Sequence, residues 1–172
     1  DNLVKLEKAG AAAIVYKSLF EEQIQLESLE IEQSHEAYSN WDAEHDSFFP
    51  SMKHGGPAEH LLRLRQARNA ISIPLIGSLN CVYQDTWLEY AQKMAETGID
   101  ALELNFYASE IDFEADGAGI VSNQLEILRE IHRAIRIPVI VKLSPYYTNA
   151  LSVISKMDKA GASGFVLFNR LF

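Results

Sequence analysis

The chain has 172 residues, of which 48% are hydrophobic and 23% charged, so it can bury a sizeable core and does not have the composition of a disordered protein. Its formal net charge of −9 argues against non-specific binding to nucleic acid or to an anionic membrane, since both require clustered Lys and Arg. No apolar stretch approaches the roughly 20 residues of a membrane span, and the single Cys81 fits a reducing, cytoplasmic compartment.

Helical and strand patterns alternate along the chain. Helical periodicity recurs in five segments: residues 2–9, 58–70, 86–96, 123–135 and 149–160. A short apolar run follows each of them: residues 14–17, 75–79, 101–105, 139–143 and 165–169. Short continuous apolar strands that alternate with helices indicate parallel βαβ units.

Two kinds of strand entry alternate in a regular repeat. One is a glycine turn after a helix, at Gly10, Gly98 and Gly161, and the other is Ile-Pro, at Pro74 and Pro138. The two prolines lie 64 positions apart, and the last two glycines lie 63 apart. A repeat of that length is a quarter of an eight-stranded TIM barrel of about 250 residues.

We therefore expect an α/β fold, a TIM (β/α)8 barrel of which this chain carries about five of eight strands, in one partial barrel domain over residues 1–172. The chain is then a fragment of a barrel. An open doubly wound sheet is the alternative, but no G-x-G-x-x-G follows the first strand. The interval after the first strand is longer than the others, which predicts an insertion over residues 21–56, helical in its first half.

Polar side chains stand at the C-terminal end of every predicted strand. They are Lys17 with Ser18, Ser78 with Asn80, Asn105, Lys142 with Ser144, and Asn169 with Arg170. In a barrel the C-terminal strand ends carry the active site, whereas the opposite end serves stability. We therefore expect two lysines and three amides to share one mouth.

Lys142 ends an apolar strand, where a lysine is costly unless a polar or anionic group meets it. It can face a bound anion or a developing negative charge. It can instead be structural and pair with Glu103, which lies two residues before Asn105 on the same side of its strand. Asn105, taken singly, is equally consistent with a structural amide.

Other candidate features have simpler interpretations. The basic run RLRQAR, residues 63–68, fits the solvated face of a helix, and Cys81 fits a packing role. The spacings of His45, His54 and His60 match no compact metal site, so no metal is expected. The acidic run at residues 110–119 is interpreted as a mobile lid with glycine hinges, and Ser122 with Asn123 as the N-cap of the following helix.

Four segments, VYKSLF, ALELNFYAS, VIVKLSPYYT and FVLFNR, resemble the FMN-dependent dihydroorotate dehydrogenases, in the order in which that family has them. The resemblance implies a barrel that holds FMN across its C-terminal mouth. It implies that Lys17 lies beside flavin and substrate, that Ser18, Asn105 and Lys142 bind the cofactor, and that Asn105 and Asn169 contact the substrate. Lys142 would face the flavin edge that becomes negative when hydride arrives.

The same resemblance exposes departures at the positions that contact substrate in the family. The family's Cys or Ser base is Ala108 here, its proline is Ser109, a substrate-binding asparagine is Glu110, and another asparagine is Pro50. Alanine cannot accept a proton, so Ser109 can be the base only if the loop shifts by one residue, and Tyr107 only if its phenol is strongly perturbed.

The resemblance implies an FMN-dependent oxidoreductase of pyrimidine biosynthesis that oxidises the CH–CH bond of dihydroorotate or an analogue. Its expected partner is a small-molecule substrate. Formation of a homodimer is a further possibility that the sequence leaves undecided. Two alternatives remain: a flavin-binding barrel that lacks the family's base, and an aldolase-type barrel with a Schiff-base lysine. Because the family's FMN-phosphate loops follow later strands, we expect this stretch alone to hold FMN poorly.

Overall fold

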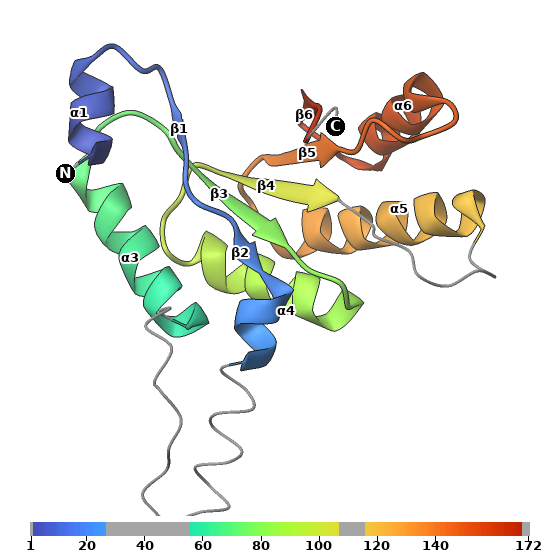
Figure 1. Cartoon of the computed structure of the whole chain (residues 1–172), viewed down its shortest axis with the longest axis horizontal. Helices are drawn as coiled ribbons and strands as arrows, with labels where there is room; N and C mark the ends of the chain where they lie inside the picture. Colours follow the sequence, from blue (N-terminus) through green and yellow to red (C-terminus); the bar gives the residue numbers. More distant parts are fainter. Residues whose placement is uncertain (1, 27–55, 107–115, 170–172) are drawn as a thin grey trace, which may run out of the picture.

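The computed structural model describes residues 2–26, 56–106 and 116–169, which form one parallel sheet and the helices that pack on it (Figure 1). The strands are β1 (Ile14–Val15), β2 (Leu19–Phe20), β3 (Leu75–Asn80), β4 (Ala101–Phe106), β5 (Val139–Leu143) and β6 (Gly164–Leu167). The helices are α1 (Asn2–Lys8), α3 (Pro57–Ala70), α4 (Gln84–Ala95), α5 (Gly117–Ala134) and α6 (Ala150–Ala160), and residues 21–26 are also helical.

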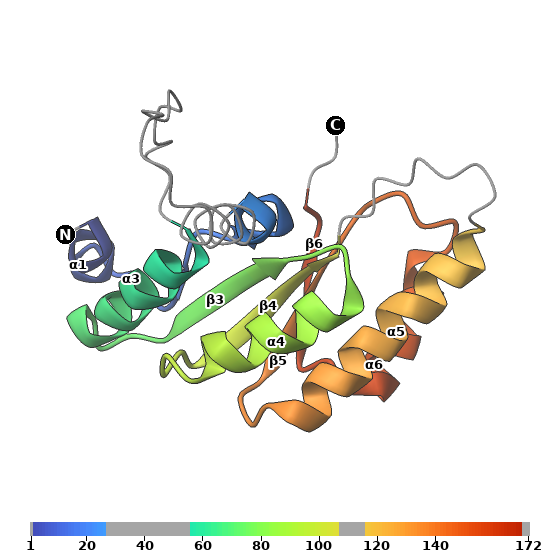
Figure 2. The ribbon, with the colours of Figure 1, turned by 90° about the horizontal axis from the view of Figure 1, so that it is seen from below.

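The strands follow the order β1-β3-β4-β5-β6, and every pair is parallel. This order confirms the predicted βαβ repeat. The first predicted strand, residues 14–17, is shorter in the structure, where β1 covers only Ile14–Val15. The short strand β2, which was not predicted, follows it, and both strands pair with β3. Helices α3 to α6 lie on the same face of the sheet, whereas an open doubly wound sheet has helices on both faces (Figure 2). The arrangement is therefore half of a barrel.

The core lies between the sheet and these helices. Leu79, Leu104 and Val141 are register neighbours on β3, β4 and β5, and all three are fully buried. Alternate residues of the same strands point to the other face, where the register sets Ser78 beside Glu103, and Asn105 beside Lys142. The sheet therefore has an apolar face toward the helices and a face that carries polar side chains.

Helix α5 begins earlier than the sequence pattern predicts. Its N-cap is Asp116, whose Oδ1 accepts a hydrogen bond of 2.6 Å from the backbone N–H of Gly119. The interpretation of Ser122 and Asn123 as the N-cap is therefore wrong, since both lie inside the helix. Gly117 and Gly119 of the acidic run lie in the first turn of α5, so the interpretation of these glycines as hinges is wrong. The helix can start on a Gly-rich sequence because the aspartate cap supplies a hydrogen bond to its first turn.

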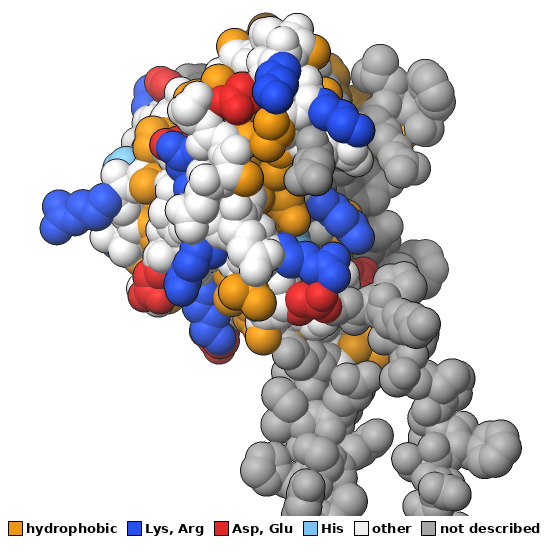
Figure 3. Space-filling model, turned by 90° about the vertical axis from the view of Figure 1, so that its left-hand side faces the viewer, with side chains coloured by type: hydrophobic (Ala, Val, Ile, Leu, Met, Phe, Trp, Pro, Cys, Tyr) orange, Lys and Arg blue, Asp and Glu red, His pale blue; other side chains and the backbone are white. Residues whose placement is uncertain are grey.

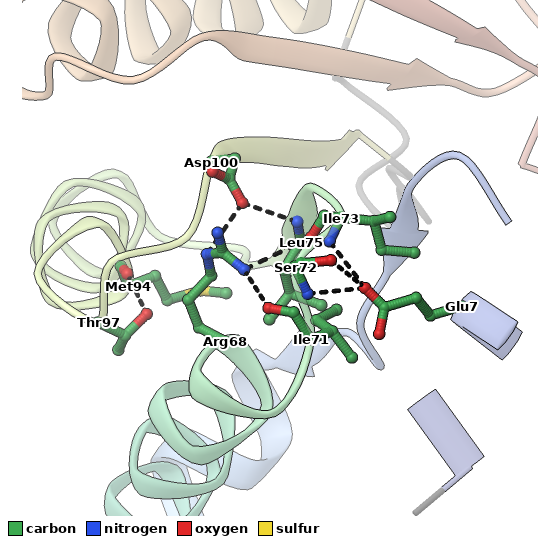
Figure 4. Close-up of polar contacts among 9 residues, drawn as sticks. All are labelled: Glu7, Arg68, Ile71, Ser72, Ile73, Leu75, Met94, Thr97 and Asp100. Carbon is green, nitrogen blue, oxygen red and sulfur yellow. Dashed lines mark hydrogen bonds and ion pairs between the residues drawn. The ribbon is translucent and has the colours of Figure 1, made fainter. Parts of the chain in front are cut away.

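Side chains fix the start of β3 at the N-terminal end of the sheet (Figure 4). Arg68 donates from Nη1 to the carbonyl of Ile71 at 3.0 Å and forms an ion pair of 3.1 Å between Nε and Asp100 Oδ2. The same Asp100 oxygen accepts the backbone N–H of Leu75 at 2.8 Å. The turn before β3 and the turn before β4 are thereby joined.

Glu7 of α1 completes this end of the sheet (Figure 4). Its Oε1 accepts from the hydroxyl and the backbone N–H of Ser72, at 2.6 and 2.7 Å, and from the N–H of Ile73 at 3.1 Å. The bonds from the Ser72 hydroxyl and backbone hold the pKa of Glu7 below its ordinary value. The Glu7 carboxylate thus accepts hydrogen bonds from backbone N–H groups of the turn before β3.

The side of the molecule that carries α1 and α3 shows Lys and Arg side chains among hydrophobic ones (Figure 3). Arg63 and Arg65 of α3 are exposed, which confirms the predicted solvated face. Arg68, from the same basic run, is partly buried and paired with Asp100, so the prediction is wrong for this residue.

We predict that Gly161→Ala destabilises the fold more than Gly98→Ala does. Both glycines have positive φ, at +112° and +89°, where a non-glycine residue costs about 1–3 kcal/mol. A Cβ at Gly161 would also lie 2.6 Å from the His132 ring, whereas nothing lies within 4 Å at Gly98. Urea unfolding measures both changes. His132→Ala should remove the excess in the Gly161→Ala background, and equal effects of the two glycine changes would contradict the steric argument.

Candidate functional site

A chain of polar side chains crosses the polar face of the sheet. Ser18, between β1 and β2, lies 2.7 Å from Ser78 of β3, measured between the hydroxyl oxygens. Ser78 donates to Glu103 Oε1 of β4 at 2.8 Å, so its own oxygen is left to accept from Ser18. Lys142 Nζ of β5 lies 3.9 Å from the same Glu103 oxygen. Segments far apart in the sequence are thereby linked.

Burial makes this chain of contacts significant. Ser78 is 1% exposed and Glu103 is 3% exposed, and a carboxylate so far from water is unfavourable unless other groups replace its hydration. The Ser78 hydroxyl and the Lys142 ammonium do this. The structure therefore shows the pairing of Lys142 with Glu103 that the sequence left as an alternative. At 3.9 Å the contact is too long for a hydrogen bond, so it does not use the ammonium's hydrogens.

Asn105 lies next to this network with an unused acceptor. Its register partner is Lys142. Its backbone carbonyl oxygen accepts a hydrogen bond from Asn80 Nδ2 at 2.8 Å. The side chain is buried, and its Oδ1 has no hydrogen-bond partner among the residues that the structure describes. A buried amide oxygen without a partner costs about 1–3 kcal/mol. Such an atom beside a lysine indicates a place where a ligand can donate a hydrogen bond.

The remaining predicted site residues are spread along the same edge. Lys17 is exposed between β1 and β2, and Asn169 lies two residues after the end of β6, with its backbone N–H bonded to the Leu143 carbonyl at 2.9 Å. The structure thus joins Ser18 to the network through Ser78 and pairs Asn105 with Lys142. Among the described residues, no hydrogen bond or ion pair joins the side chain of Lys17 or Asn169 to them. Ser109, with Ala108, Glu110 and Pro50, lies outside the described residues.

Glu21 is a buried acid that the sequence pattern does not single out. Its Oε1 accepts from Gln25 and Thr86, at 2.6 and 3.2 Å, and its Oε2 accepts from the backbone N–H of Val82 at 3.1 Å. Glu21 therefore fixes the start of the predicted insertion against the loop that follows β3. Cys81 is buried beside it, and burial followed by the charge of Glu21 raises the pKa of the thiol, in keeping with a packing role.

A cavity of about 990 Å³ lies between α5, α6 and the loop after β5. Neither Asn105 nor Lys142 lines it, so the cavity is separate from the polar network.

Within the described ranges, no three His, Cys, Asp or Glu side chains are grouped so as to hold a metal ion. None of the helices found in that same part of the chain has the length and hydrophobicity needed to cross a membrane.

Comparison with known proteins identifies dihydroorotate dehydrogenases as relatives. A putative dihydroorotate dehydrogenase A (fumarate) of Aeropyrum pernix is 32% identical over 113 residues, which are 63% of this chain and 35% of that protein. The dihydroorotate dehydrogenase B (NAD(+)) catalytic subunit of Thermoplasma volcanium is 32% identical over 97 residues, 56% of this chain and 32% of the relative. The chain thus spans about a third of the length of these curated relatives. They confirm the resemblance read from the sequence.

Solved structures support the fold. A crystal structure of phosphonopyruvate hydrolase in complex with oxalate and Mg++ matches with a TM-score of 0.59, covering 95% of this chain and 53% of that one at 14% identity. At that identity the match concerns the fold alone, and it confirms the partial TIM barrel. No protein-family model matches the chain.

We predict that protonation of His60 destabilises the protein below neutral pH. His60 is buried against Tyr16, with 5.6 Å between ring centroids, and burial, then the charges of Lys17 and Arg63, lowers its pKa. As pH falls through the ordinary value near 6.5, the unfolded chain binds a proton that the folded chain does not, so the free energy of unfolding falls. Urea unfolding at pH 7 and 5 should show a smaller loss in His60→Phe, and an equal loss would exclude His60.

We also predict that Ser78→Ala is more destabilising than Ser18→Ala. Ser78→Ala removes the only hydrogen bond to Glu103 found in the described residues and costs about 1–3 kcal/mol. Ser18→Ala leaves that bond intact and should cost about 1 kcal/mol or less. Urea unfolding at neutral pH compares the two variants. A larger effect of Ser18→Ala would show that Glu103 does not depend on Ser78.

Proposed function

We propose that this chain forms part of the flavin site of an FMN-dependent oxidoreductase of the dihydroorotate dehydrogenase type. The observation that carries the proposal is Asn105 Oδ1 at the C-terminal strand ends, buried and without a partner among the described residues, on the residue whose register neighbour is Lys142. Polar groups at that end of a barrel form active sites. The relatives supply the class of reaction: several are dihydroorotate dehydrogenases.

The residues present fit FMN. The isoalloxazine ring carries a ring N–H and two carbonyl groups, so it can donate to an amide oxygen such as Asn105 Oδ1 and accept from an ammonium such as that of Lys142. FMN, when bound, supplies a ring that accepts a hydride from the substrate. Lys142 stabilises the negative charge that develops there, most strongly where water is excluded.

Glu103 and Ser78 position Lys142. The carboxylate is held by the Ser78 hydroxyl and attracts the ammonium from 3.9 Å, which limits the directions in which the flexible lysine can point.

The substrate is a small molecule with an oxidisable CH–CH bond, dihydroorotate or an analogue. In this proposal Lys17 acts beside flavin and substrate, Ser18 borders the cofactor, and Asn105 and Asn169 contact the substrate. Ser109 is the proposed base because Ala108 cannot accept a proton. Ala108 also favours a second candidate, a flavin-binding barrel without the family's base. The proposed place of action is the cytoplasm, in pyrimidine biosynthesis.

We predict that Asn105→Leu weakens FMN binding about tenfold without lowering the free energy of unfolding. The tenfold change corresponds to about 1.4 kcal/mol, the size of one hydrogen bond. Stability is unaffected because Oδ1 has no partner in the described protein to lose. Flavin fluorescence quenching, in a protein that completes the barrel around this chain, and urea unfolding measure the two quantities, with Lys5→Met on α1 as control. A variant that loses stability but binds FMN as the wild type does would make Asn105 structural.

We further predict that Lys142→Met slows reduction of the FMN-loaded protein by dihydroorotate at least tenfold, because the developing charge loses a stabilising cation. Anaerobic loss of visible flavin absorbance gives the rate, and Lys5→Met again serves as control. Unchanged reduction in Lys142→Met would remove this lysine from the mechanism. A wild-type protein that binds FMN but is never reduced would favour the flavin-binding barrel without a base.

A further inference from the structure

We propose that the cavity between α5 and α6, here called the α5–α6 groove, binds a small organic phosphate that carries an aromatic ring. The two helices lie side by side in both ribbon views (Figures 1 and 2). The groove encloses about 990 Å³, at the upper end of the range for small-molecule sites. It is lined by both helices and by the loop that joins β5 to α6.

The charge of the lining indicates an anion. Arg129 of α5 and Lys156 and Lys159 of α6 line the groove, whereas no Asp or Glu is among its described lining residues. This is unusual in a chain with a net charge of −9. None of the three cations forms an ion pair with another residue in the ranges that the structure describes. They are therefore available to a ligand, and Arg can bind a phosphate through two parallel hydrogen bonds.

The other end of the groove suits a ring. Tyr147 donates its hydroxyl to Gln124 at 2.8 Å, which ties the β5–α6 loop to α5 across the groove. Tyr146 is 72% exposed at the rim and can stack on a planar group. Buried Leu125 and Val153 supply apolar wall. The lining thus changes from aromatic and apolar to cationic along the helices.

Along α5, the axial separation between Gln124, which holds Tyr147, and Arg129 of the cationic end suits a compact ligand. Arg129 follows Gln124 by five residues on α5, which is a rise of roughly 7.5 Å. Lys156 and Lys159 are three residues apart on α6 and therefore lie on neighbouring positions of one face. A nucleoside monophosphate, with its base at Tyr146 and its phosphate at the three cations, has this polarity. Inorganic phosphate alone would use only the cationic end.

This site is independent of the proposed flavin site. Ser18, Ser78, Glu103, Asn105 and Lys142 are all absent from the lining of the groove. A ligand in the groove would therefore contact helices that pack on the sheet and none of the network on its polar face. Binding in the groove can be tested whether or not the chain holds FMN.

The test is isothermal titration calorimetry of the 172-residue chain with adenosine 5′-monophosphate, inorganic phosphate and adenosine as probes. The variant Arg129→Gln/Lys156→Gln/Lys159→Gln removes the three cations. The matched control, Lys5→Gln/Arg133→Gln/Arg136→Gln, makes the same change in net charge with residues that do not line the groove. Circular dichroism establishes that both variants fold.

We expect adenosine 5′-monophosphate to bind more tightly than phosphate or adenosine, and its Kd to rise at least tenfold in the groove variant but less than twofold in the control. Tyr146→Ala should weaken binding of the nucleotide and leave that of phosphate unchanged. Asn105→Leu should leave both the Kd of the nucleotide and the Kd of phosphate unchanged. Absence of nucleotide binding to the wild type would overturn the proposal. An equal rise of Kd in both triple variants would also overturn it, because the attraction would then be long-range.

Discussion

The buried carboxylate of Glu103 is the constraint on which the arrangement of the sheet depends. An ionised carboxylate that is 3% exposed costs several kcal/mol unless other groups replace its hydration. The Ser78 hydroxyl and the Lys142 ammonium can do so only if β3, β4 and β5 are parallel neighbours in the observed register. The contacts that compensate for the burial of Glu103 therefore also position Lys142 in the candidate site.

The two ends of the sheet satisfy their polar groups in different ways. At the N-terminal end, Arg68, Asp100 and Glu7 meet the backbone groups of the turn before β3 with hydrogen bonds of mostly 2.7–3.1 Å. At the C-terminal end, Asn105 Oδ1 is buried without a partner among the described residues. This is the division between stability and function known from TIM barrels. The candidate site lies at the end of the sheet that keeps this open acceptor.

Much of the fold could be predicted because its signals are local. Glycines at helix ends, at Gly98 and Gly161, have the positive φ that a helix stop requires, and each Ile-Pro marks a strand entry as expected. The predictions were wrong where a weak local signal or a residue distant in the sequence determines the structure. Asp116 caps α5 although a Gly-rich turn follows, and the unpredicted strand β2 forms where the chain after β1 pairs with the end of β3. Arg68 leaves the solvated face because Asp100 lies within reach.

The sequence by itself determined the order of helices and strands and brought polar residues to the strand ends, because helix stops, strand entries and apolar runs each depend on a few adjacent residues. Only the tertiary structure decided which of those residues meet. Ser18 and Ser78 are 60 positions apart and Ser78 and Glu103 are 25 apart, yet they are hydrogen-bonded. The pairing of Lys142, the unused oxygen of Asn105 and the cations of the α5–α6 groove follow from strand register and helix packing, which bring together side chains whose separation along the chain carries no information about their distance in space.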